Sequence, residues 1–287
     1  MSENVQVTGL RFRPLDYERH SQCETVRVAE VIEIDDPDDP RLDDFRDLST
    51  ADRRPDRPGG RGLVIAEGVV VVERLLASPY PVRAVLGVRR RVEALGELPA
   101  PAYVTSADVM ARVVGFHLNR GVLAAADRAP QPSLEELAAG RRLAVLEGVG
   151  DHENLGALFR NAAALGIDGV VLGPGCSDPL YRRSVRVSMG HVLRVPFAAV
   201  DDWPGGLKLL QDKGFVVAAL TPRVGSVELP DAGLRGRRVA VLLGSEGPGL
   251  TEEAIGAADV AVRIPMSPGV DSLNVATAAA VAFYAIA

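Results

Sequence analysis

The chain is poor in cysteine and contains no long apolar run. Only two cysteines occur among its 287 residues, Cys23 and Cys176, and they lie far apart in the sequence. We therefore expect neither a disulfide framework nor a zinc site, and two isolated thiols fit a reducing cytoplasm. No uninterrupted apolar run reaches the roughly 18 residues that a membrane span needs. The first residues also lack a basic stretch followed by an apolar one, so we expect no signal peptide.

The chain also lacks the excess of positive charge that is typical of a passive nucleic-acid coat. Its formal net charge is −6, and 47% of its residues are hydrophobic, as expected of a globular protein with a substantial core. Charge is segregated, however, because an Asp-rich stretch at 33–47 is followed by arginines that include Arg53 and Arg54. A solvated surface explains any one such cluster, and binding of a phosphate is the alternative. A nucleic-acid enzyme is therefore not excluded.

Composition and turn signals divide the chain into an N-terminal arm (1–62), a small α/β unit (63–128), a linker (129–142) and a second α/β unit (143–287). The arm contains one strand-like run at 26–34, and the linker contains a helix start at Ser133. The small unit carries no acid, base or metal constellation. Its His117 and Arg120 are candidate substrate contacts, with a structural role as the alternative.

The second unit alternates apolar runs typical of buried strands with helical patterns. The expected strands are 143–147, 169–172, 192–195, 215–220, 239–243 and 260–264. The expected helices are 154–165, 179–187, 203–213, 252–257 and 273–285. This alternation predicts a parallel sheet covered by helices on both faces. Ligands of such sheets bind beyond the carboxyl ends of the strands.

Three segments of this unit place Gly and small polar residues beside a strand or at the start of a helix. They are Asn-Leu-Gly-x-x-x-Arg-Asn at 154–161, Gly-Ser-Glu-Gly-Pro-Gly-Leu at 244–250, and 264–275, which opens with Ile-Pro-Met and closes with Ser-Leu-Asn-Val. Backbone amides approach a ligand closely only where side chains are small. The three segments therefore predict a bound cofactor in the second unit.

Individual residues of these segments have expected places. A dinucleotide fingerprint is missing, because the third glycine of Gly-x-Gly-x-x-Gly would fall on Glu153. We expect Asn154 to be the N-cap of the following helix and Ser272 that of the closing helix. Asn274 then lies in the first turn of that helix and points into the site. Glu246, inside a loop of glycines and proline, is placed to bind a ligand hydroxyl or amine.

In this order, the three segments resemble the three motifs of the SpoU-type RNA ribose 2′-O-methyltransferases of the SPOUT superfamily. The resemblance covers about 141–287, and residues 186–196 are similar to the stretch between the first two motifs of that family. The small unit at 63–128 is similar to the L30e-like RNA-binding domain that often precedes it.

The resemblance implies a deep trefoil knot in the last third of the chain, S-adenosylmethionine as cofactor, a homodimer and no metal. The cofactor-binding residues that it implies are Leu243, Gly244, Ser245, Gly249, Ile264, Met266, Ser272 and Leu273. The implied catalytic residues are Arg160, Asn154, Glu246, Ser272 and Asn274, and RNA would contact His117, Arg120, Arg53 and Arg54. The resemblance implies Arg160 as the base that activates the hydroxyl; because an arginine stays protonated, the interpretation favoured here is that Arg160 stabilises negative charge, with the base as the alternative.

The implied substrate is a ribose in structured RNA, because a 2′-hydroxyl must be present. Ribosomal RNA is favoured over transfer RNA, since members with the small domain often act there. A non-catalytic RNA-binding or assembly factor on the same fold is the main alternative, although it would not need Arg160, Glu246 and Asn274 together. A Rossmann-type enzyme of small-molecule metabolism lacks its glycine fingerprint here. Methylation of a base or of a protein is disfavoured only by the resemblance.

Overall fold

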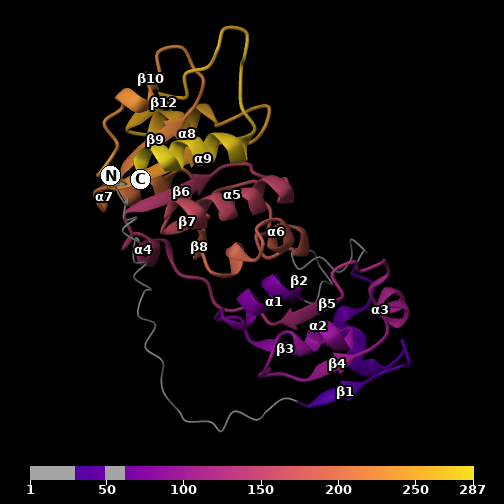
Figure 1. Ribbon diagram of the computed structural model, residues 1–287. Helices are drawn as coiled ribbons and strands as arrows, with labels where there is room; N and C mark the ends of the chain where they lie inside the picture. The colour runs from indigo at the N-terminus through magenta and orange to yellow at the C-terminus, as the bar shows by residue number, and fades with distance from the viewer. Residues whose placement is uncertain (1–29, 49–61) are drawn as a thin grey trace, which may run out of the picture.

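The computed structural model describes residues 30–48 and 62–287, which form two α/β units joined by residues 127–133 (Figure 1). The smaller unit contains a five-stranded sheet with the order β1-β4-β3-β5-β2. The larger unit contains a seven-stranded sheet with the order β10-β12-β9-β11-β6-β7-β8, and all of its pairs are parallel. The α/β class and the parallel sheet expected from the sequence are confirmed.

The smaller unit has a mixed sheet, because β5 runs antiparallel to both β2 and β3. Its elements are β1 (Val31–Glu33), η1 (Pro40–Phe45), β2 (Val64–Glu67), α1 (Val69–Leu76), β3 (Val82–Gly87), α2 (Arg89–Glu93), β4 (Ala102–Val104), α3 (Ala107–Val114) and β5 (Val122–Ala126). Residues 30–48, which belong to the expected arm, contribute β1 to this sheet, paired with β4. Leu42 and Phe45 of η1 are buried in the core of the same unit.

The larger unit alternates strands and helices along its whole length. Its elements are α4 (Leu134–Leu137), β6 (Arg142–Leu146), α5 (His152–Leu165), β7 (Gly169–Leu172), α6 (Arg182–Val187), η3 (His191–Leu193), β8 (Phe197–Ala199), α7 (Gly205–Asp212), β9 (Val216–Leu220), β10 (Val227–Glu228), η4 (Leu229–Asp231), β11 (Val239–Leu243), α8 (Glu252–Ala257), β12 (Val260–Arg263) and α9 (Val275–Ile286). None of the helices in the described part of the chain combines the length and apolar character that a membrane crossing requires.

The prediction of a strand at 192–195 is wrong. Those residues form η3 and the turn after it, and the edge strand is β8, which begins at Phe197. Val192 and Val195 are apolar because they are buried in the core around α5, not because they belong to the sheet. A short apolar run shows only that its residues are buried, and it fits a buried turn as well as a strand.

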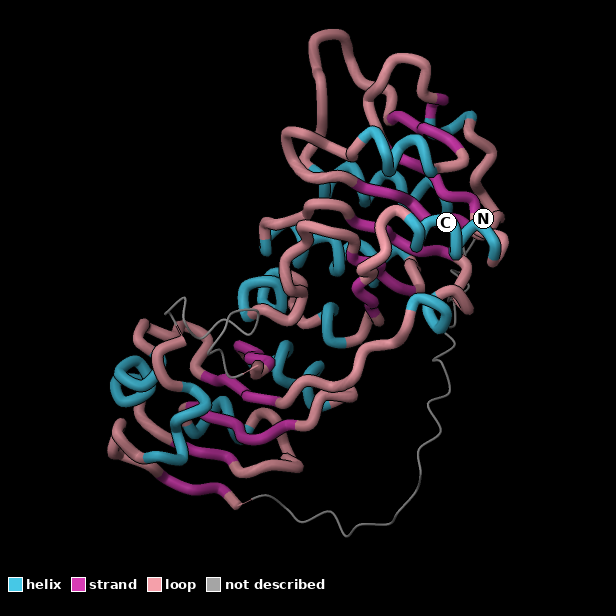
Figure 2. Tube along the Cα trace, turned by 180° about the vertical axis from the view of Figure 1, so that it is seen from behind, coloured by secondary structure: helices cyan, strands magenta, loops and turns pink. Residues whose placement is uncertain are grey.

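Helices cover both faces of the large sheet, and the alternation of side chains along β6 shows how. Leu143 and Val145 pack on one face in a core that includes residues of α4, α7 and α8. Ala144 and Leu146 point to the other face, where α5 and α9 lie side by side (Figure 1). The loops that follow β9 and β12 project beyond the sheet in both views of the molecule (Figures 1 and 2).

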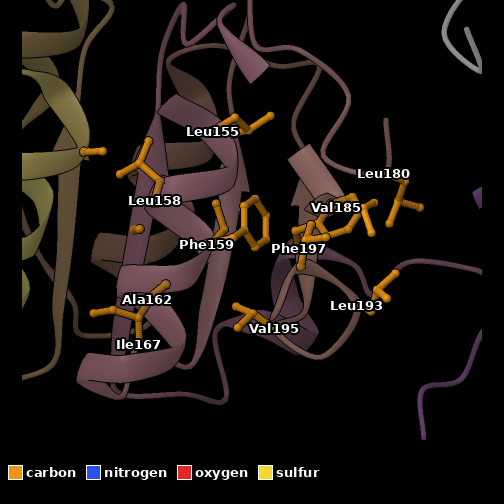
Figure 3. Close-up of a cluster of buried hydrophobic side chains, with 14 of the residues drawn as sticks. Leu155, Leu158, Phe159, Ala162, Ile167, Leu180, Val185, Leu193, Val195 and Phe197 are labelled. Carbon is orange, nitrogen blue, oxygen red and sulfur yellow. The ribbon is translucent and has the colours of Figure 1, made fainter. Parts of the chain in front are cut away.

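Helix α5 is held by a dense apolar cluster on its inner side (Figure 3). Phe159 is fully buried and meets Phe197 edge to face, with ring centroids 5.8 Å apart and an interplanar angle of 86°. Gly156 lets α6 approach closely, because a Cβ there would lie 2.8 Å from the Ser184 carbonyl oxygen. This packing fixes the orientation of α5 and of the polar residues on its other side.

The two units touch through α6 and the turn after it. The Arg182 guanidinium lies 3.4 Å from the carboxylate of Glu67 and 4.5 Å from the centre of the Phe116 ring, both in the smaller unit. Burial lowers the pKa of Arg182. Arg74 of α1 donates a hydrogen bond to the carbonyl of Met189, in the turn that follows α6. The interface therefore brings arginines of both units to one region of the surface.

Candidate functional site

The three predicted segments meet at one side-chain amide, that of Asn274. Its Nδ2 donates to Asn154 Oδ1 at 2.8 Å and to Glu246 Oε1 at 2.7 Å. Its Oδ1 accepts from the backbone N–H groups of Ala276 at 3.0 Å and Thr277 at 3.3 Å. An asparagine amide has two N–H donors and one oxygen acceptor, so every polar group of Asn274 is engaged. The amide is thus locked in one orientation at the carboxyl ends of the strands.

Two helix starts differ from those expected. The N-cap of α5 is Asp151, whose side chain accepts from Glu153 N–H at 2.9 Å, and Asn154 lies inside the first turn. The N-cap of α9 is Asn274, whereas Ser272 lies two residues earlier and is exposed. Because Asn274 is itself the N-cap, the expectation that it would lie in the first turn of the helix was also wrong. Ser, Asp and Asn all serve as caps, so spacing alone does not choose among neighbours.

The loop at 244–250 is closed tightly on itself. A Cβ at Gly244 would lie 2.3 Å from the carbonyl carbon of Gly249 and 2.4 Å from Leu250 N. Gly249 N–H donates to the Ser245 carbonyl at 3.2 Å, and Ser245 Oγ donates to the Gly249 carbonyl at 3.3 Å. Gly247 has a φ of 87°, which favours glycine. The loop therefore exposes backbone groups and the Glu246 carboxylate on a rigid frame.

The other predicted cofactor residues flank this loop. Leu243 is the buried last residue of β11. Ile264 and Met266 are half-buried at the start of the segment between β12 and α9. Leu273 is 39% exposed just before the α9 cap, and Ser272 is exposed beside it. The structure thus brings the second and third segments together at the same end of the sheet as Asn154.

Arg160 lies on α5 with an exposed side chain. Its positive charge acts on nearby His191. The pKa of His191 is lowered mainly by burial and then by the positive charges of Arg74, Arg194 and Arg160. Arg74 belongs to the smaller unit, and the other two arginines belong to the larger one. Three arginines from two units therefore lie near His191, and their positive charges favour a bound anion.

Among the RNA-contact candidates, the structure places His117 and Arg120 in the turn between α3 and β5 of the smaller unit, where both are exposed. Phe116, which packs under Arg182, directly precedes His117 and puts this turn beside the interface. Arg53 and Arg54 lie outside the described residues.

Two further features lie near the site, and the second escaped the sequence analysis. A pocket at α6 is lined by Tyr181, Arg182, Arg183 and Arg186, three of which belong to an arginine cluster visible in the sequence. Glu147 directly follows β6 and is a buried carboxylate that accepts hydrogen bonds from Thr251, directly after the 244–250 loop. Its only signal in the sequence is an acidic residue at the end of an apolar strand. In the described ranges, no group of three His, Cys, Asp or Glu side chains is arranged to hold a metal ion.

Residues 141–284 match the model of the SpoU rRNA Methylase family, and this range contains Asn154, Glu246 and Asn274. The chain belongs to that family. An uncharacterized tRNA/rRNA methyltransferase of Mycobacterium tuberculosis is 60% identical over 262 residues, which cover 89% of this chain and 91% of the relative. The 23S rRNA (guanosine(2553)-2′-O)-methyltransferase RlmP of Bacillus subtilis is 29% identical, covering 77% of this chain and 86% of its own length.

Solved structures agree with the observed fold. The AdoMet-bound rRNA methyltransferase of Sinorhizobium meliloti superimposes with a TM-score of 0.74 at 24% identity, covering 89% of this chain and 97% of the other. A match at this identity shows a shared fold that extends over both units. The family recognised from the three segments is confirmed by the family model and by the close relative.

Proposed function

We propose that this SpoU-family protein transfers a methyl group from S-adenosylmethionine to the 2′-hydroxyl of a ribose in structured RNA, with ribosomal RNA as the preferred substrate. The observation that carries the proposal is the Asn274 amide, which holds Asn154 and Glu246 together beside the glycine loop. The name of the Bacillus subtilis relative supports ribosomal RNA. Transfer RNA is the alternative, because the name of the mycobacterial relative includes both RNAs.

The cofactor residues proposed are Leu243, Gly244, Ser245, Gly249, Ile264, Met266, Ser272 and Leu273. They fit an adenosine-type ligand because the 244–250 loop is rigid, carries only small residues around Glu246, and presents polar backbone groups. One Glu246 oxygen accepts from Asn274, and the other is left to accept from a ligand hydroxyl or amine. When bound, S-adenosylmethionine would supply a methyl group on a positively charged sulfur; transfer of this methyl group to the ribose oxygen would leave S-adenosylhomocysteine and release the hydroxyl proton to water.

The protein's own part in the reaction is positioning and charge stabilisation. Asn154 accepts at its Oδ1 from Asn274, which leaves its NH₂ group to donate to the substrate. Arg160 keeps its proton, so we assign it to the RNA phosphate and to the negative charge that develops on the ribose oxygen. The nearby positive charges of Arg74 and Arg194 favour the same negative charges on the RNA phosphate and the ribose oxygen. Ser272 completes the catalytic set, and no metal is needed.

We also propose the domain roles that the family resemblance implies. Residues 63–128 are an L30e-like domain that binds the RNA substrate through His117 and Arg120, with Arg53 and Arg54 of the 1–62 arm as further contacts. Residues 129–142 link it to the methyltransferase domain at 143–287, whose last third forms the trefoil knot. The ion pair of Arg182 with Glu67 supports cooperation between the two domains. A cytoplasmic location follows from the proposed substrate.

A homodimer formed through α9 is the proposed assembly. This helix exposes Val281 and Tyr284 to 40% and 76%, on the side away from Phe283, which is buried. Exposed apolar side chains on one helix face are typical of a self-complementary interface.

Substituting Val281→Glu is expected to halve the mass in sedimentation velocity, because a buried unpaired carboxylate opposes association. Val224→Glu, at a fully exposed position in the loop after β9, is the control. Equal masses for the wild type and both variants would argue against this interface.

Methyl transfer to RNA is the direct test of the function. The purified protein would be incubated with S-adenosylmethionine and either ribosomal or transfer RNA, and the RNA digested to nucleosides for mass spectrometry. We expect a 2′-O-methylated nucleoside from ribosomal RNA. The same product from transfer RNA alone would support the alternative substrate, and a methylated base would overturn the proposed chemistry. Cofactor binding without any transfer would support a non-catalytic RNA-binding factor.

A further inference from the structure

Glu147 is a buried carboxylate whose hydrogen bonds come from two distant segments. Its side chain is at the end of β6, and the residue is 5% exposed. Oε1 accepts from Trp203 Nε1–H at 2.7 Å and from Thr251 Oγ1–H at 2.9 Å, and Oε2 accepts from Thr251 N–H at 2.9 Å. A buried carboxylate is costly unless donors surround it. Three donors arranged around one carboxylate therefore indicate a selected structure rather than an incidental contact.

These contacts hold the 244–250 loop at both of its ends. On one side, Glu147 N–H donates to the carbonyl of Leu243, the last residue before the loop, at 2.9 Å. On the other side, the Glu147 side chain binds the backbone and hydroxyl of Thr251, the first residue after it. Gly148 lies close to the start of the loop, because a Cβ there would lie 3.1 Å from Ser245 Cβ. The residue that directly follows β6 thus contacts the chain both where the loop leaves the sheet and where it returns.

We propose that Glu147 is a positioning residue for the cofactor, acting through the 244–250 loop without touching the ligand. The inference rests on the proposed function, because it takes this loop as part of the S-adenosylmethionine site. The carboxylate keeps Thr251 next to the end of β6. The loop amides and Glu246 then stay in the geometry that the ligand needs.

Trp203 provides a direct optical signal for this network. It is the single tryptophan of the chain, so the intrinsic tryptophan fluorescence comes from the indole that donates to Glu147. The ring is packed closely, since a Cβ at Gly173 would lie 2.8 Å from Trp203 Cζ3. Binding of the cofactor to the loop is therefore expected to change the Trp203 emission through Thr251 and Glu147.

The test is titration of S-adenosylhomocysteine, the demethylated product of the cofactor, into the wild type and Glu147→Gln. Glutamine offers one acceptor oxygen in place of two, so it cannot accept from donors at both ends of the carboxylate. We expect about tenfold weaker binding by calorimetry, as for the loss of one hydrogen bond to a charged group. The ligand-dependent change of Trp203 emission is expected to shrink as well. Glu253→Gln, which alters an exposed carboxylate of α8, is the matched control and should bind like the wild type.

The outcomes separate this inference from the proposed function. If the wild type binds the ligand and both Glu147→Gln and the control bind it with equal affinity, the proposed role of Glu147 is overturned. The cofactor proposal then still stands. A wild type that binds neither S-adenosylhomocysteine nor S-adenosylmethionine overturns both. Circular dichroism checks that Glu147→Gln is folded. If it is not, Trp203→Phe decides, because it removes the N–H donor together with one ring of the indole and keeps an aromatic ring at the position. Calorimetry should then show several-fold weaker binding, and unchanged affinity would overturn the inference.

Discussion

Replacing Arg160 by alanine is expected to lower the rate of methyl transfer to RNA by about 100- to 1000-fold, as when one charge-stabilising donor is removed from an active site. Arg160 is exposed, whereas Phe159 and Ala162, which anchor α5 in the apolar cluster, are fully buried. The substitution therefore removes charge from the site without opening the core. Single-turnover kinetics with saturating RNA would measure the loss, and calorimetry should show cofactor affinity close to that of the wild type.

Two further variants make the Arg160 result specific. Arg160→Lys keeps the charge but loses the planar fork of donors, so activity is expected to fall between the wild type and Arg160→Ala. Arg141→Ala removes an exposed arginine at the opposite end of β6, where its side chain donates to the Gly236 carbonyl at 3.1 Å. This control should retain full activity. Wild-type rates in Arg160→Ala would contradict the assignment of this residue to the developing charge.

Replacing Gly244 by alanine is expected to reduce kcat/KM for the cofactor by about 100-fold, the cost of displacing a reacting group by about 1 Å. The new Cβ would lie 2.3 Å from the carbonyl carbon of Gly249 and 2.4 Å from Leu250 N. Both are backbone atoms, so the loop itself must move. Its shift displaces Glu246 and the exposed amides from the ligand. Initial rates at varied S-adenosylmethionine concentration would give the change.

Gly256→Ala is the matched control for this substitution. Gly256 lies in α8, a short distance along the chain from the loop, and no atom lies within 4 Å of a Cβ added there. Alanine favours a helix by about 1 kcal/mol over glycine, so the control should be as stable as the wild type or more so. Equal cofactor kinetics for Gly244→Ala and Gly256→Ala would show that the loop tolerates the added methyl group. The proposed loop geometry would then be wrong.

Much of the larger unit could be predicted from the sequence, because its strands are buried on both faces. Residues 169–172 and 239–243 are continuous apolar runs and form β7 and β11 with those bounds. The expected helix at 252–257 likewise coincides with α8, for which Thr251 is the N-cap. Where burial and secondary structure coincide in this way, periodicity and turn signals locate the element.

The errors arose where local signals were ambiguous. Val192 and Val195 are buried outside the sheet, so their apolar character predicted a strand that does not exist. Asn154 and Asn274 are both good caps by residue type, but only Asn274 caps a helix. Which asparagine caps its helix depends on tertiary contacts, because the Asn274 amide also donates hydrogen bonds to Asn154 and Glu246.

By itself, the sequence determined the class of fold, the order of the three segments and the family, because these depend on residue types and spacings along the chain. The tertiary structure decided which atoms of those segments meet. The bond from Asn274 to Asn154 joins residues 120 positions apart, and that from Thr251 to Glu147 joins residues 104 positions apart. Such contacts are set by strand order and register in the sheet, which no local pattern encodes. Glu147 is the clearest case, because its role is visible only when β6 lies beside β11.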